Sequence, residues 1–213
     1  MTQEPHELPY EPIPTRKLNP FYGLIALFLA ILVFGVSLHG YRLLFHPVPK
    51  VVIPLIESQE LITEMPEHLF GSWRDLSFIQ NDMDQIKIIA NRIVSRACPG
   101  GDNVCQSEAT YQFVRDRITY VPDEHFHDAL QHPLVTINSG GADCEDMAVL
   151  LGLLAKAIGN EARLVHIPGH VYTQIRIPKY KKNWINLDPT CKQCKFGKIP
   201  SSSDLQKKDF FEL

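Results

Sequence analysis

The stretch SGGADCEDMAVLLGLLAKAIGN, residues 139–160, contains a turn, a helix start and a helix end in a single run. The two glycines suit a tight turn, and Asp143 is a residue type that caps helices with its side chain. The helix predicted from Cys144 to Ile158 is apolar on almost every side, and Gly159 can close it. Such a helix belongs at the centre of a core, with a cysteine at its N-terminal end.

Three segments after this helix are typical of β-strands: ARLVHIP, HVYTQIRIP and NWINLDPT. They are rich in β-branched residues and are bounded by glycine, proline or asparagine. Because side chains alternate along a strand, His170 and Asp188 each project from the face opposite the aliphatic residues of their own strand. The sequence therefore predicts a buried helix followed by strands, with His170 and Asp188 facing away from the aliphatic stripe.

Cys144, His170 and Asp188 supply, in chain order, the parts of an activated thiol. A free cysteine is mostly protonated near neutral pH, and a helix N-terminus lowers its pKa. A histidine within hydrogen-bond reach takes the thiol proton, and an acid behind it fixes the tautomer and stabilises the imidazolium. The order of these residues predicts a Cys-His-Asp catalytic triad.

Three acids surround the predicted nucleophile: Asp143, Glu145 and Asp146. Nearby negative charge raises the pKa of a thiol, so an ion pair with His170 must outweigh it or one acid must point away. Capping gives Asp143 a reason to point away. Glu145 and Asp146 lie in the first helical turn, where acids are stabilised by the helix dipole.

The segment from Tyr111 to Thr190 resembles the transglutaminase-like superfamily of papain-type cysteine enzymes. The stretches that carry the resemblance are FVRDRITYVPD, SGGADCEDMAVLLGLLAKAIGNEARLVHI, a Gly-His pair at a strand start, and NWINLDPT. Acids directly after the cysteine are similar to those of bacterial transglutaminase-like cysteine proteinases. The resemblance implies the triad Cys144, His170 and Asp188. It also implies an α+β fold in which the cysteine helix packs on a small antiparallel sheet.

The chain departs from the family pattern after the histidine, where members often have Ala-Trp and this chain has Val171 and Tyr172. This change bears on the shape of the acceptor channel. For the oxyanion hole, the backbone N–H of Cys144 is a natural donor. Gln112 and Tyr120 are the candidates for a second donor.

The predicted activity is attack of the Cys144 thiolate on an amide carbonyl of a protein or peptide, which gives a thioester. Water would then release an acid, whereas an amine would form a cross-link. We expect hydrolysis, because water is the simpler acceptor, and we expect no cofactor. Two alternatives stay open: a non-catalytic, membrane-tethered binding module, and a zinc-stabilised scaffold that faces the cytoplasm.

Four further cysteines lie outside the predicted nucleophile: Cys98, Cys105, Cys191 and Cys194. The Cys-x-x-Cys pair resembles half of a zinc knuckle, but the spacing of the earlier pair is wide for the other half. Two disulfides, local or crossed, are the other solution, and we favour them for a domain on an oxidising side. Either arrangement would hold the segment that follows Asp188.

A long uncharged run, FYGLIALFLAILVFGVSL at residues 21–38, follows a predicted disordered tail at 1–20. At about 1.5 Å per residue the run covers most of a hydrocarbon core of roughly 30 Å. It predicts a single transmembrane anchor at 21–41, with a buried core helix and a cleaved signal peptide as alternatives. The paired cysteines favour an extracytoplasmic catalytic domain.

The remaining segment boundaries follow from the positions of prolines and from the spacing of apolar residues. A proline-containing stalk is predicted at 42–56, the transglutaminase-like domain at 57–200, and a polar C-terminal tail at 201–213. Within the domain, apolar residues at helical spacing predict helices at 81–97 and 107–118.

Composition excludes one class of partner. The net charge is -3 over 213 residues, and no basic block suggests nucleic acid. One polar loop holds a group of potential metal ligands whose spacing fits no zinc motif, so we expect a solvated loop and no metal there. These residues are His125, His127, Asp128 and His132.

Overall fold

The computed structural model describes residues 20–45, 62–72, 74–123, 129–178 and 183–213, with side chains for all of these except 20 and 38–45. The chain divides into two compact units, Met1–Lys50 and Val51–Leu213. The predicted tail before residue 20, the stalk from residue 46 and the predicted domain start at 57 lie outside the described residues.

The described part of the first unit is the helix α1 (Pro20–Phe45), which includes the whole apolar run. The helix continues through residues 42–45, which had been predicted as stalk, because the first proline after the run is Pro47. The side chains of residues 21–37 are exposed. Within the residues that the structure describes, no helix reaches the length and hydropathy required for crossing a membrane.

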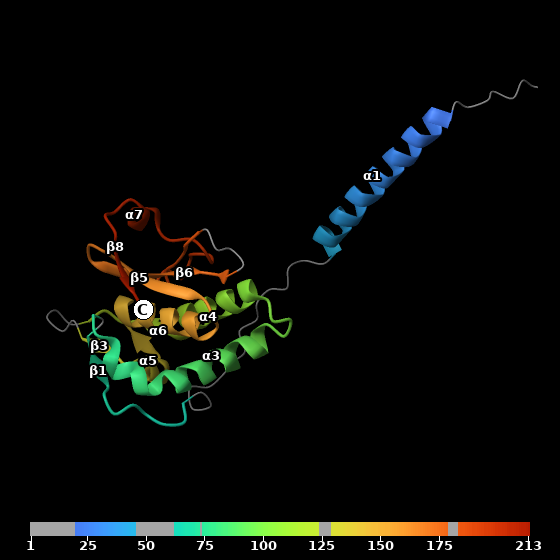
Figure 1. The fold of residues 1–213 in the computed structure, drawn as a ribbon. Coiled ribbons are helices and arrows are strands. Elements are labelled where there is room, and N and C mark those ends of the chain that lie inside the picture. Colours follow the sequence, from blue (N-terminus) through green and yellow to red (C-terminus); the bar gives the residue numbers. More distant parts are fainter. Residues whose placement is uncertain (1–19, 46–61, 73, 124–128, 179–182) are drawn as a thin grey trace, which may run out of the picture. The chain divides into compact units, whose positions relative to one another are not determined.

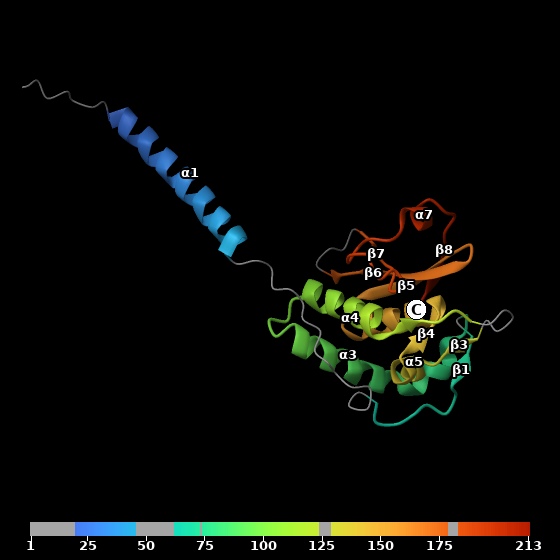
Figure 2. The same cartoon turned by 180° about the vertical axis from the view of Figure 1, so that it is seen from behind.

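The second unit is an α+β domain built around a four-stranded antiparallel sheet with the order β7-β6-β5-β8. Helices α3, α4 and α6 lie on one side of this sheet, and the short helix α7 lies on the other (Figures 1 and 2). The α+β prediction is confirmed. The elements are α3 (Met83–Ala97), α4 (Asn103–Arg117), α6 (Cys144–Ala157), β5 (Glu161–Ile167), β6 (His170–Arg176), β7 (Ile185–Leu187), α7 (Ser201–Asp204) and β8 (Asp209–Glu212).

Short elements complete the domain at the end that holds Cys144. Two of the strands form an antiparallel pair, β1 with β3, and two form a parallel pair, β2 with β4. Their bounds, with those of the remaining helices, are β1 (Phe70–Gly71), η1 (Leu76–Asp82), β2 (Thr119–Tyr120), β3 (Leu130–Gln131), α5 (Pro133–Ser139) and β4 (Gly141–Ala142).

The helix predicted at residues 107–118 begins earlier than its apolar pattern indicates. The structure starts α4 at Asn103 instead of Ser107, because the Asp102 carboxylate caps it by accepting a hydrogen bond from the Cys105 N–H at 3.1 Å. Cys105 therefore lies in the first turn of a helix and not in a loop.

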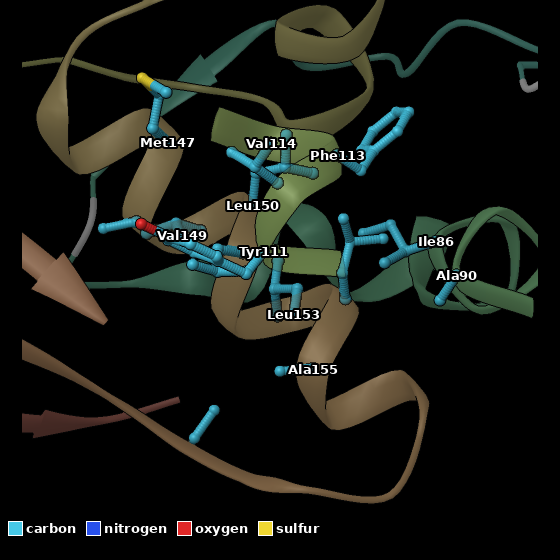
Figure 3. Packing of buried hydrophobic residues seen from close by; sticks show 14 of the residues in the cluster. Ile86, Ala90, Tyr111, Phe113, Val114, Met147, Val149, Leu150, Leu153 and Ala155 are labelled. Atoms are coloured by element: carbon cyan, nitrogen blue, oxygen red, sulfur yellow. The ribbon is translucent and has the colours of Figure 1, made fainter. Parts of the chain in front are cut away.

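The core surrounds α6, as the all-apolar pattern predicted. Every residue of this helix from Glu145 to Ala155 is buried. Aliphatic side chains of α6 pack against α3 and α4 on one side and against β5 and β6 on the other (Figure 3). Burial on all sides fixes the axis of α6, and with it the position of Cys144 at the helix N-terminus.

The predicted polar tail at 201–213 is wrong, because its last part is a strand of the sheet. β8 pairs antiparallel with β5, with Phe210 opposite Val165 and Phe211 opposite Leu164. Only two apolar residues stand between Asp209 and Glu212, so the segment is too short and too charged to show a strand pattern on its own.

Candidate functional site

The N-terminal end of α6 is held by a reciprocal cap. The Asp143 carboxylate accepts a hydrogen bond from the Asp146 N–H at 3.2 Å, and the Asp146 carboxylate accepts one from the Asp143 N–H at 3.5 Å. Cys144 is the first residue of the helix and is half-buried. The predicted capping role of Asp143 is confirmed.

His170 begins strand β6 directly after a two-residue turn. Gly169 adopts a left-handed conformation with φ +74°, and Ile167 pairs with His170 across the hairpin. The His170 Nε2 lies 2.9 Å from Asp188 Oδ2. The other carboxylate oxygen, Asp188 Oδ1, accepts hydrogen bonds from the Thr190 N–H at 3.1 Å and the Thr190 hydroxyl at 2.7 Å.

The Asp188 carboxyl is 1% exposed, and its surroundings keep it ionised. Burial alone would raise its pKa, but the hydrogen bond and charge of His170, with the bonds from Thr190, hold the pKa of Asp188 below its usual value. Since Nε2 of His170 faces this carboxylate, Nδ1 is the ring nitrogen left to take a thiol proton.

The Cys144 thiol is bound to an acid in the described structure, and not to His170. The thiol donates a hydrogen bond to Glu145 Oε2 at 3.0 Å. Burial, followed by the hydrogen bond and charge of Glu145, raises the pKa of Cys144 to about 12, and the backbone N–H of Val171 opposes this rise. Because Val171 follows His170, the Cys144 sulfur lies at the start of β6. The sulfur is still protonated there, since the thiol donates to Glu145.

Buried carboxyls crowd around this thiol. Burial, followed by the charge of Glu145, raises the pKa of Asp143 to about 7, and burial with the charge of Asp143 raises the pKa of Asp146 to about 7. Carboxylate oxygens of Asp123, Asp143 and Glu145 all lie within 4.8 Å of one another. An all-oxygen set of this kind, in which Asp123 is exposed and the other two acids are buried, fits a hard cation, because the ion would supply positive charge to neutralise the buried pair.

The predicted histidine loop makes no such group among the described residues. His125, His127 and Asp128 lie outside them, and His132 is fully buried instead of solvated. The His132 Nδ1 accepts a hydrogen bond from the Leu134 N–H at 3.2 Å and so caps α5. Its Nε2 lies 3.3 Å from Asp82 Oδ2 without hydrogen-bond geometry.

The two candidates for a second oxyanion donor have different surroundings. The Gln112 amide donates to Glu108 Oε1 at 2.9 Å, within its own helix. Tyr120 pairs with Ala142, two residues before Cys144, and burial, followed by the charges of Cys144 and Asp143, raises the pKa of its phenol. Tyr120 is therefore the better candidate, and its role stays a prediction.

The outer cysteines form two local disulfides. Cys98 at the end of α3 is bonded to Cys105 in α4, and Cys191 is bonded to Cys194 after β7. Among the described cysteines only Cys144 is free. Of the two arrangements considered for these cysteines, the structure contains the disulfides, and each joins two cysteines that are close in the sequence.

Two residues near the site were missed in the sequence. Asp123 follows β2 and joins the acidic group through a contact that sequence spacing does not reveal. Tyr111, fully buried in α4, donates its hydroxyl to the carbonyls of Asp188 at 3.3 Å and Cys194 at 3.0 Å. The hydroxyl of a tyrosine on the buried face of a helix needs a hydrogen-bond partner, so the sequence could have indicated that Tyr111 contacts a polar group.

Comparison with known proteins finds one family model that matches the part of the chain with this site. Residues 89–189 match the model of the transglutaminase-like superfamily. The comparison with curated proteins found no match.

Among solved structures, LapG of Legionella pneumophila is similar at 16% sequence identity and a TM-score of 0.43, over 68% of this chain and 90% of LapG. A calcium-bound form of LapG gives the same identity and TM-score over 65% of this chain and 87% of that one. A protein of Cytophaga hutchinsonii described as a candidate cysteine protease is similar at 15% identity and a TM-score of 0.41, over 81% of this chain and 57% of its own.

The matched segment runs from within α3 to Pro189 and contains Cys144, His170 and Asp188 in the order of the sequence resemblance. The resemblance to the transglutaminase-like superfamily is therefore confirmed for the segment that contains the predicted triad.

Proposed function

We propose that the domain is a thiol-dependent enzyme that cleaves amide bonds of proteins or peptides, with Cys144 as nucleophile. The observation that carries the proposal is the pair between His170 Nε2 and the ionised Asp188 carboxylate at 2.9 Å. His170 begins β6, and the backbone N–H of the next residue, Val171, faces the Cys144 sulfur. A histidine oriented by a buried carboxylate, beside a thiol at a helix N-terminus, is the arrangement that thiol catalysis requires.

The first step moves the thiol proton. The Cys144 S–H turns from Glu145 to His170 Nδ1, and Asp188 stabilises the imidazolium that forms. The thiolate attacks the amide carbonyl carbon, and in this proposal the N–H of Cys144 and the phenol of Tyr120 donate to the oxyanion. His170 then returns the proton to the leaving amine, and a thioester remains.

We place hydrolysis before cross-linking for the second step. Neutral His170 takes a proton from water, the hydroxide attacks the thioester, and Cys144 leaves as thiolate with release of the acid. An amine acceptor would follow the same path and would form a new amide. Offering a labelled primary amine together with a protein substrate separates the two, because hydrolysis leaves the amine unincorporated.

The experiment that tests the proposal is labelling with iodoacetamide near neutral pH, followed by peptide mapping. We expect the label on Cys144, at a rate that depends on His170. The non-catalytic binding module is favoured by one observation, the pKa of about 12 for the resting thiol. No labelling of Cys144, with the four outer cysteines still oxidised, would support the module and contradict the enzyme.

The acidic group beside the thiol is the proposed site of a divalent cation, and this replaces the expectation of no cofactor. Asp123, Asp143 and Glu145 would hold the ion through carboxylate oxygens, the ligands that Ca²⁺ prefers. A calcium-bound form is known for LapG, which makes Ca²⁺ the ion to test first. When bound, the ion would supply positive charge next to Cys144 and so favour its thiolate.

Calcium should stabilise the domain most at high pH. The pKa values of Asp143 and Asp146 are raised from 3.8 to about 7, so stability is lost as pH rises through that window and both acids ionise. Calcium at about 100 times its Kd adds about 2.7 kcal/mol. Calorimetry at pH 8 should therefore show a higher melting temperature with Ca²⁺, and at pH 5 little change.

A single substitution separates the cation site from the cap. Glu145→Gln removes one ligand charge, so we expect the calcium effect to disappear, and Cys144 to be alkylated about tenfold faster without the ion, a change of one pKa unit. Asp146→Asn is the matched control, since it is equally buried but lies outside the ligand group. An unchanged calcium response in Glu145→Gln would remove Glu145 from the site.

We also propose that α1 anchors the domain to a membrane, with the domain on the extracytoplasmic side. The support is the uncharged run within residues 21–38, whose described side chains are all exposed, and the two disulfides. Full-length protein should stay with membranes after carbonate washing, and external protease should reach the domain in intact cells. Release by carbonate would contradict the anchor, and protection from protease would reverse the orientation.

A further inference from the structure

The two disulfides differ in how a reductant can reach them. Cys98 is 5% exposed and belongs to the core cluster, and its half-buried partner Cys105 packs against that cluster. Cys191 and Cys194 are both half-buried, and the two residues between them, Lys192 and Gln193, are exposed. Thiol–disulfide exchange requires access of a thiolate to sulfur, so the Cys191–Cys194 bond is the more accessible of the two.

Cationic side chains bond the backbone next to the accessible disulfide, and one of them, Arg115, is also paired with the Asp116 carboxylate at 2.7 Å. The Arg115 guanidinium donates to the Cys194 carbonyl at 3.1 Å, and Lys192 Nζ donates to the carbonyls of Ile118, at 2.8 Å, and Arg115. Lys195 follows directly in the sequence. Positive charge near a Cys-x-x-Cys pair lowers the pKa of its thiols, and a thiol of low pKa is a better leaving group in exchange.

The same segment holds the carboxylate behind His170. The Cys191 N–H donates to the Asp188 carbonyl at 3.3 Å, and the Cys194 N–H donates to the Cys191 carbonyl at 3.1 Å. The Tyr111 hydroxyl bridges the carbonyls of Asp188 and Cys194. The disulfide therefore closes a turn that fixes both ends of the Asp188–Cys194 segment against Tyr111 of α4.

We propose that Cys191–Cys194 is a thiol–disulfide exchange site for a dithiol reductant, and that its oxidised form positions Asp188 for His170. This inference depends on the proposed function of the triad. In the exchange, a thiolate of the dithiol attacks one sulfur and releases the other as thiolate. The second thiol of the reductant then breaks the mixed disulfide. The products are two thiols at Cys191 and Cys194 and an oxidised dithiol.

Reduction opens the turn and frees the Cys194 carbonyl from its position at Tyr111. Asp188 keeps its bonds from Thr190 but loses the fixed backbone position that places Oδ2 opposite His170. His170 then accepts the thiol proton less well, and Cys144 becomes less reactive. Asp188 acts here through His170, so the disulfide positions a residue and takes no part in the chemistry.

The test uses the full-length chain equilibrated in buffers of increasing dithiothreitol, with each disulfide followed by mass spectrometry. We expect Cys191–Cys194 to be reduced at a concentration that leaves Cys98–Cys105 intact. After removal of the dithiol, the rate of iodoacetamide reaction at Cys144 should be five- to tenfold lower, and reoxidation should restore it. Reduction of both disulfides together, or an unchanged Cys144 rate, would overturn the inference.

Matched variants separate positioning from general loosening of the fold. Cys191→Ser with Cys194→Ser should reproduce the lower Cys144 rate, whereas Cys98→Ser with Cys105→Ser should stay within twofold of wild type. In a His170→Ala background, reduction of Cys191–Cys194 should no longer change the rate. An equal loss with and without His170 would overturn the positioning role.

Comparison of the His170→Ala variant with the wild type distinguishes failure of this inference from failure of the proposed function. If His170→Ala leaves the Cys144 rate at the wild-type value, the triad itself is wrong, and the inference is overturned with it. If the rate depends on His170 but not on the state of Cys191–Cys194, only the exchange site is wrong.

Discussion

Replacing Cys144 with alanine will abolish the proposed amide cleavage, with a loss of roughly 10³-fold or more, because a thioester requires a free thiol and the other described cysteines are in disulfides. Iodoacetamide labelling at near-neutral pH will disappear with it, since the other described cysteines are in disulfides. The fold should survive, because the removed atom is small and half-buried at a helix end.

Circular dichroism and the melting temperature provide the control for this variant. A melting temperature within a few degrees of the wild type, together with complete loss of cleavage, assigns the effect to chemistry. Cleavage at the full rate by folded Cys144→Ala protein would end the enzyme proposal as stated.

His170→Ala is expected to be nearly as damaging as the loss of the thiol, by roughly 10²- to 10⁴-fold, the range of a general base. The reason is particular to this site. Burial and Glu145 raise the pKa of Cys144 to about 12, so without His170 the thiol stays protonated at neutral pH. The rate of alkylation of Cys144 against pH measures this directly.

Asp188→Asn is expected to lower the activity less than His170→Ala, so the two variants are compared directly. Asparagine keeps a side-chain oxygen for Thr190 but loses the charge that stabilises the imidazolium, so the loss should be smaller than for His170→Ala. A harmless Asp188→Asn would make Asp188 a turn residue only. An unchanged alkylation rate in His170→Ala would show that the helix N-terminus alone activates the thiol.

The parts of the site that could be predicted depend on local sequence. Asp143 caps α6 within four residues, and Gly169 forces a turn that starts β6 at His170, so both positions follow from residue type and spacing. The α+β architecture follows from the same signals, since a buried helix and a hairpin each have a distinct apolar period.

The parts that could not be predicted depend on contacts between distant segments. The Tyr111 hydroxyl donates to a carbonyl 77 residues later, and Asp123 approaches Asp143 and Glu145 from the segment after β2. The direction of Glu145 depends on its rotamer, and the sequence left open whether one of these acids pointed away. β8 is a strand only because β5 is there to pair with it.

The unequal strand lengths of the main sheet bear on self-association. The central strands β5 and β6 have seven residues each, whereas the outer strands β7 and β8 have three and four. Short outer strands offer few unpaired backbone groups to a second copy of the chain, and the charges of Asp209 and Glu212 on β8 oppose stacking of identical edges. The short, charged outer strands thus protect the sheet against edge-to-edge aggregation.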